Sequence, residues 1–302
     1  MLTLSSLNRV RYYPEIIPDT NLYAQINAGA TASPAPADIR GIPDLSIKAV
    51  GLNYAPTAGM DLEIKTDGTI DRIPLGSQLP TFGNIAYTAK NVLGVNLLNI
   101  GVAPVNNFYL AAEYMITKPT ITEKLLRKWP LTQEEKAIAD ELGVHETVEK
   151  GIRPITWDYM RDREYQVIGE RVYGNSLNLA PGTDATVLDL KVSNPDELYI
   201  IDGIMSPNTL FADDVTLTIK RDGDANYITV RAAALAGVNR INCWIPALQE
   251  LIITATAAQP VAGAAILFNV KKARLTNILK ARWGIAGNMP ADVIKKVQAG
   301  IL

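Results

Sequence analysis

Short alternating runs of hydrophobic and polar residues cover most of the chain. In "VTLTIKR", residues 215–221, apolar and polar residues alternate, which is the period of a β-strand with one buried face. Similar runs are separated by Pro-Gly, Asn-Pro, Asp-Gly and Ser-Pro, dipeptides that are frequent in turns. Short strands with turn signals about every 8 to 12 residues predict antiparallel β-sandwich or jelly-roll domains.

Two of these strand patterns recur along the chain. "LEIKTDGTI" (62–70) and "LTIKRDGDA" (217–225) each end in Asp-Gly, which adopts the positive φ angles of a tight hairpin. Further on, "LLNIGVAPVNNFYLAAEYMI" parallels "LIITATAAQPVAGAAILFNV", and each is predicted to form two apolar strands around a proline-containing turn. Polar and turn residues interrupt the second copy, so we expect no membrane span there.

An amphipathic helix is also predicted twice. In "KPTITEKLLRKW" (118–129) and "KARLTNILKARW" (272–283) apolar residues recur every four positions, as on one face of an α-helix. The two segments align at an offset of 154 residues, which matches Thr122 with Thr276. We expect Leu275, Leu279 and Trp283 to face inward, and Trp129 and Trp283 to act as core anchors.

A second helix is expected after each of these segments. "PLTQEEKAIADELG" begins with a Thr132-x-x-Glu135 capping box and ends at Gly143, while "NMPADVIKKVQAG" runs from Asn288 to Gly300. Two strand patterns and two helices therefore recur in the same order. This ordered recurrence of unlike elements favours an internal duplication.

The predicted fold is mainly β with accessory helices, in two tandem antiparallel sandwich or jelly-roll domains, each followed by a helical pair. The "ATASPAPAD" segment favours an extended chain because prolines and small residues resist helix and sheet. Four parts are expected: an extended N-terminal arm (1–40), a first β-domain with its helices (41–143), a connector (144–164), and a second β-domain with its helices (165–302).

The composition offers little for catalysis. The chain of 302 residues has a net charge of −2, one histidine and one cysteine, so a zinc site built on Cys and His is excluded. His145 follows a helix end and is interpreted as a surface residue, and Cys243 as a buried strand thiol. Asp213-Asp214 and Asp222-Gly-Asp224 could lie close together across a hairpin and suit calcium, but turn geometry explains the Asp-Gly pair better. No phosphate-binding glycine loop is present. We expect no cofactor and no enzymatic activity.

The two helical segments differ in net charge. Residues 271–302 contain seven basic residues and one acid, whereas residues 118–143 contain five of each. We interpret the excess either as a solvated surface or as an interface for an acidic neighbour or packaged nucleic acid. Neutralising the basic residues before Trp283 should then weaken assembly or raise its salt sensitivity. The candidate interface residues are Lys271, Lys272, Arg274, Lys280 and Arg282.

The strand and turn pattern of the second half resembles that of structural proteins of bacteriophages and other viral particles. The resemblance rests on "NSLNLAPGTDATVLDLKVSNPDELYIIDGIMSP" followed by "VTLTIKRDGD". It implies a virion component that forms or stabilises the capsid and has copies of itself and other virion proteins as partners. The first residues, "MLTLSSLNRVRYYPE", lack the long apolar stretch of a secretory signal, so we expect synthesis in the host cytoplasm without a signal peptide. The alternatives are a phage tail or receptor- or carbohydrate-binding protein, and an enzyme whose site the sequence does not reveal.

Overall fold

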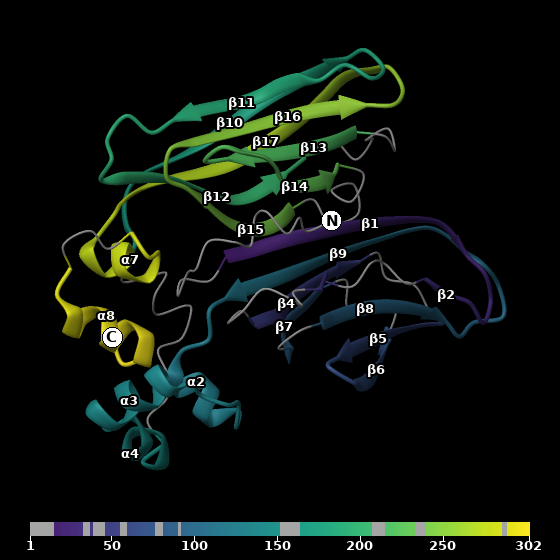
Figure 1. The fold of residues 1–302 in the computed structure, drawn as a ribbon. Helices are drawn as coiled ribbons and strands as arrows, with labels where there is room; N and C mark the ends of the chain where they lie inside the picture. The colour runs from purple at the N-terminus through teal and green to yellow at the C-terminus, as the bar shows by residue number, and fades with distance from the viewer. Residues whose placement is uncertain are drawn as a thin grey trace.

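The protein forms three antiparallel β-sheets with short helices gathered at one end (Figure 1). This confirms the prediction of a mainly β fold with accessory helices. The computed structural model describes residues 15–32, 37–38, 46–54, 59–75, 81–89, 92–151, 164–206, 215–232, 240–285 and 289–302.

The largest sheet has eight strands and runs through both halves of the chain. Every neighbouring pair in it is antiparallel. Its second-half strand β15 pairs with its first-half strand β1, so one sheet joins the two halves (Figure 1). In spatial order the strands are β10 (Gln166–Leu179), β17 (Val261–Arg274), β12 (Glu197–Met205), β15 (Arg240–Ala247), β1 (Glu15–Ile26), β9 (Val105–Thr117), β4 (Ser46–Tyr54) and β7 (Thr81–Ala89).

Each half has a second, smaller sheet. The strands of the second half are β11 (Ala185–Lys191), β16 (Glu250–Ala257), β13 (Val215–Arg221) and β14 (Asp224–Arg231), in spatial order. Those of the first half are β2 (Thr31–Ala32), β8 (Val92–Asn99), β5 (Met60–Thr66) and β6 (Thr69–Leu75), and β3 (Ala37–Asp38) also pairs with β8.

The two halves share one topology. The order β1-β9-β4-β7 in the first half matches β10-β17-β12-β15 in the second, and β2-β8-β5-β6 matches β11-β16-β13-β14. In both halves the chain crosses repeatedly from one sheet to the other, as in a jelly roll. The sandwich or jelly-roll prediction is thus confirmed, while duplication as the origin of the repeat stays a prediction.

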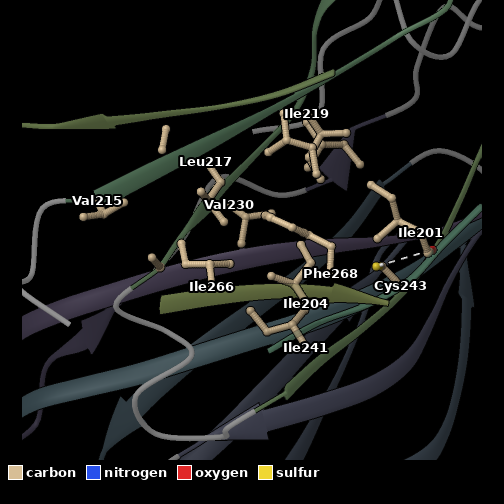
Figure 2. Packing of buried hydrophobic residues seen from close by; sticks show 14 of the residues in the cluster. Ile201, Ile204, Val215, Leu217, Ile219, Val230, Ile241, Cys243, Ile266 and Phe268 are labelled. Atoms are coloured by element: carbon tan, nitrogen blue, oxygen red, sulfur yellow. Dashed lines mark hydrogen bonds between the residues drawn. The ribbon is translucent and has the colours of Figure 1, made fainter. Parts of the chain in front are cut away.

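The core of the second half lies between its two sheets (Figure 2). Side chains from the eight-stranded sheet, such as Ile201 and Phe268, meet side chains from the smaller sheet, such as Leu217 and Val230. The period of two along each strand places these residues on the inner face. The same buried cluster continues into the first half through Ile26, Met60, Leu62, Ile64, Leu97 and Tyr114.

Both predicted Asp-Gly hairpin turns are confirmed. Asp67-Gly68 joins β5 to β6 and Asp222-Gly223 joins β13 to β14, and all four residues have positive φ angles. The apolar stretch 251–270 forms parts of β16 and β17, joined by a short turn but belonging to different sheets. None of the helices in the described parts of the chain is long and apolar enough to cross a membrane.

Five helices follow the strands in the described residues. The predicted capping box of Thr132 and Glu135 is confirmed, and Gly300 ends the last helix in the left-handed conformation. Asn288, the expected start of that helix, lies outside the described residues. The helices are α2 (Ile121–Leu126), α3 (Gln133–Glu141), α4 (Val144–Glu149), α7 (Asn277–Arg282) and α8 (Ala291–Ala299).

The predicted alignment of the two amphipathic helices was wrong by two residues. Thr120 caps α2 and Thr276 caps α7, each accepting a hydrogen bond from the backbone N–H three residues later. The matching residue of Thr276 is therefore Thr120, at an offset of 156, while Thr122 lies inside α2. The expected match failed because the apolar stripe alone does not mark where a helix begins.

The expected irregular arm also differs from the structure. β1, within residues 1–40, is an internal strand of the eight-stranded sheet, between β15 and β9. Likewise the expected connector, 144–164, begins with α4. The rest of the connector, from 152 to 163, lies outside the described residues. The four domain boundaries themselves stay a prediction.

Candidate assembly surface

Helix α7 packs on the outer face of its own half of the large sheet. Leu275, Leu279 and Trp283 are buried, as predicted, against Trp244 of β15. Trp244 also packs edge-on against Tyr165, with ring centroids 5.2 Å apart. The cluster is completed by Leu198, Ile200 and Ala273. This helix is thus anchored to three strands of the sheet.

Helices α2, α3 and α4 pack on one another and on α8 from the other half of the chain. Ile121 of α2 and Ala299 of α8 belong to one buried cluster, with Ile138, Ala139 and Val144. The Thr122 hydroxyl donates a hydrogen bond of 2.5 Å to the Ala299 carbonyl. Trp129, expected in a core, is only half-buried.

The C-terminal residues are held at this junction by backbone geometry and charge. Gly300 has a φ of +80°, and a Cβ there would lie 2.6 Å from the Thr120 hydroxyl oxygen. Only glycine therefore fits this position. The Lys295 ammonium lies 2.5 Å from the Glu141 carboxylate of α3. The C-terminal residues thus hold the second half in contact with α2 and α3 of the first half.

Arg282, one of the predicted interface residues, is not on the surface. Its side chain is 1% exposed and forms two hydrogen bonds to the Glu164 carboxylate, of 2.7 and 2.8 Å. A third N–H donates to the backbone carbonyl of Leu302. The expectation that Arg282 belongs to an open basic face was therefore wrong, because a buried carboxylate binds its guanidinium.

Three more of the predicted basic residues have acidic partners. Lys271 lies 2.7 Å from Asp202, Lys272 lies 2.6 Å from Glu197, and Lys280 lies 2.7 Å from Asp196. The hydrogen bond to Glu197 raises the pKa of Lys272, so this amine stays protonated throughout the neutral range. Within the described residues the exposed Arg274 forms no ion pair.

The excess positive charge counted along the sequence is thus largely neutralised in three dimensions. Asp196, Glu197 and Asp202 come from β12 and the turn before it, and Glu164 precedes β10. Lys280 and Asp196 are 84 residues apart, and Arg282 and Glu164 are 118 apart. Sequence reasoning missed these partners because no local pattern links residues so far apart.

The large sheet carries a polar cluster on its outer face. The Asn269 amide donates hydrogen bonds to Glu170 and Asp202, of 2.8 and 3.2 Å. The Lys271 ammonium also binds Asp202 and lies 5.4 Å from the centre of the Trp244 ring. Arg240 lies 3.9 Å from Asp202. The cluster links neighbouring strands through side chains that form hydrogen bonds and ion pairs with one another.

The other chemically interesting side chains serve the fold. Among the described residues no group of three His, Cys, Asp or Glu side chains is placed to hold a metal ion. His145 is exposed on α4, 3.6 Å from Asp140, and Cys243 is buried with its thiol near the Ile201 carbonyl (Figure 2). The Asp222 carboxylate accepts backbone N–H groups of residues 248–250, which supports its interpretation as a turn residue.

Strand β10 is an open edge of the large sheet. It has 14 residues and pairs only with β17 among the described strands. Residues 166–176 are exposed except for the half-buried Tyr173. The exposed residues include three large aliphatic ones, Val167, Ile168 and Val172, which are 41 to 53% exposed. An exposed edge with unpaired backbone groups and apolar side chains is a template for pairing with another chain.

Comparison with known proteins gives only distant likenesses. No family model and no curated protein matches the chain. Among solved structures it is similar to the PRD1 vertex protein P5 (14% identity, TM-score 0.26, 35% of this chain and 96% of that one). It is also similar to the STIV MCP (12%, 0.23, 86% and 97%) and to a salicylate 1,2-dioxygenase from Pseudaminobacter salicylatoxidans (8%, 0.21, 84% and 70%). TM-scores this low do not establish a shared fold.

Proposed function

We propose that this chain is a non-enzymatic structural protein of a virus particle, which forms or stabilises the capsid through contacts with copies of itself and with other virion proteins. The observation that carries the proposal is the open β10 edge with Val167, Ile168 and Val172 exposed. A particle is built from one contact repeated on many copies, and an edge strand offers backbone hydrogen bonds for such a contact.

The sandwich behind this edge suits a building block. Both halves share a buried cluster, one sheet runs through both, and α8 packs against helices of the first half. Such a body resists bending between its halves, because moving one half would break sheet pairing and open packed contacts. A rigid protein that pairs with its neighbour through an edge strand can define the angle between neighbouring subunits.

The basic face supports a smaller part of the proposal than the sequence suggested. Packaged nucleic acid would have to compete with Asp196, Glu197 and Asp202 for three lysines. Of the five candidate residues, Arg274 is the one that is exposed and forms no ion pair with any described residue. We therefore place contact with nucleic acid second to contact between protein subunits, because phosphates attract clusters of free Lys and Arg.

The test is the state of the purified full chain in solution. Light scattering after size-exclusion chromatography, with nucleic acid removed, should show defined oligomers whose share grows with protein concentration. Negative-stain electron microscopy should show particles of uniform shape. A monomer at every soluble concentration would contradict the proposal.

A receptor- or carbohydrate-binding role, as on a phage tail, is favoured by a different observation. In the outer polar cluster the exposed Glu170 carboxylate and the half-buried Asp202 carboxylate could bind sugar hydroxyls, while the buried Asn269 amide holds both carboxylates in place. A glycan array distinguishes the two. Binding that is lost in Asn269→Ala but kept in Thr186→Ala on β11 would support the binding role.

A further inference from the structure

We propose that β10 of one copy pairs with β7 of the next copy, so that the eight-stranded sheet continues from molecule to molecule. This inference rests on the proposed function and names the segment that occupies the open edge. Strands β10 and β7 are the two outer strands of the large sheet. Within the described residues each pairs on one side only, with β17 and β4 respectively.

The pairing of β15 with β1 inside the chain provides the model for this contact between copies. The two halves meet where β15 of the second half pairs with β1 of the first (Figure 1). By topology β7 is the equivalent of β15, and β10 is the equivalent of β1. Among the described residues, the two outer strands of the large sheet are thus the equivalents of the two strands that already pair within it.

Strand direction agrees with this pairing. All seven neighbouring pairs of the eight-stranded sheet are antiparallel, so its first and last strands run in opposite directions. A second copy that extends the sheet in the same orientation therefore brings β10 antiparallel to β7. The internal joint is short, since the recorded pairing of β15 with β1 places Trp244 opposite Ile16, and β7 with 9 residues and β10 with 14 are both long enough for such a contact.

The charges on the two strands are compatible with such a contact. β7, "TFGNIAYTA", has no charged residue, and β10 has one acid, Glu170, and one base, Arg171. No like charges are brought together along the joint. Because backbone hydrogen bonds and apolar side chains would hold it, assembly should change little with salt, unlike a contact through the basic face.

The contact has a defined symmetry. Two different edges meet, so it is heterologous, and repetition gives a closed ring or an open chain of copies. Pairing of β10 with a second β10 would instead be two-fold symmetric and would stop at a dimer. The two arrangements predict different cross-links.

The test uses two single-cysteine variants, Val172→Cys on β10 and Thr88→Cys on β7, both in a Cys243→Ala background. A short bismaleimide is added to each variant alone and to a mixture of the two. A cross-linked product that needs the mixture supports the proposal. A product formed equally by Val172→Cys alone overturns β7 as the partner.

The remaining outcomes separate this inference from the proposed function. Oligomers by light scattering without any cross-link in the mixture would overturn edge pairing and leave the virion role standing. Monomers throughout would overturn both. As a second test, Val172→Lys should raise the apparent dissociation constant of assembly by about tenfold or more, because a lysine on an edge opposes pairing. Thr186→Lys on β11 is exposed on an edge of the other sheet and should leave assembly unchanged.

Discussion

Helices α2 and α7 occupy equivalent places in the two halves, yet they are held by different surroundings. Each has six residues, a threonine cap, and a lysine at its fourth position, Lys124 in α2 and Lys280 in α7. Helix α7 packs on its own sheet through Leu279 and Trp283, whereas α2 packs on other helices, including α8 from the second half. Similar local sequence therefore specified the helix but not its anchorage.

The charges of the two helices differ in the same way. Lys124 is 7% exposed and lies 2.7 Å from Glu135 at the start of the next helix. Lys280 is 29% exposed and pairs with Asp196, which is 66% exposed. The most buried ion pair of α7 is instead the one between Arg282 and Glu164. Burial of each pair, rather than the number of charges, should decide its contribution to stability.

The largest effect is expected for Arg282→Met. This change leaves the Glu164 carboxylate buried without its cation, which costs about 3 to 5 kcal/mol of unfolding free energy. Chemical denaturation followed by circular dichroism measures the loss. The double variant Arg282→Met with Glu164→Leu should recover most of it, because no unpaired charge then remains. Equal losses in the single and double variants would show that packing of the arginine stem matters more than its charge.

Features set by neighbouring residues could be predicted from the sequence, and contacts between distant segments could not. The Asp-Gly hairpins, the capping box and the inward-facing Leu275, Leu279 and Trp283 were predictable because each is set by residues close together in the chain. The partners of Lys280 and Arg282 were not, since they lie 84 and 118 residues away and depend on the folded topology.

Strand β1 was missed for a local reason. The extended arm was inferred from the proline-rich "ATASPAPAD" segment (30–38), which follows β1, and that inference was extended over all of residues 1–40. In the structure Pro18 lies opposite Glu113 of β9, while the recorded pairing with β15 is at Ile16. The joint between the halves is therefore made just before the proline. That one sheet spans both halves could not be predicted, because alternation identifies strands but not their neighbours.

The next effect concerns how α7 is attached to the sheet. Leu279→Ala should lower the unfolding free energy by about 2 to 5 kcal/mol, because Leu279 is fully buried and its loss leaves a cavity beside Trp244. Leu126→Ala in α2 is the matched control, since that side chain is 47% exposed and should change stability by no more than about 0.5 kcal/mol. Urea denaturation gives both values. Similar losses for the two would mean that α7 is not anchored as described.

A smaller effect is expected for Lys124→Met. The change removes the hydrogen bond to Glu135, and bonds to charged groups contribute roughly 1.5 to 3 kcal/mol. Glu135 keeps its bond from the backbone N–H of Thr132, so its carboxylate is not left without a partner. Thermal unfolding should therefore shift less than for Arg282→Met. A shift as large as that of Arg282→Met would show that the first helical pair depends on this single ion pair.

The smallest effect is expected at the equivalent position, Lys280→Met. Its partner Asp196 is exposed, so water replaces the lost ion pair and the cost should be about 0 to 1 kcal/mol. Salt should weaken the wild-type pair and make the difference smaller still. If Lys280→Met costs as much as Lys124→Met, burial does not distinguish the two helices. If it instead weakens oligomers without changing stability, Lys280 contacts a neighbouring subunit, and the basic face regains the role that its internal ion pairs argue against.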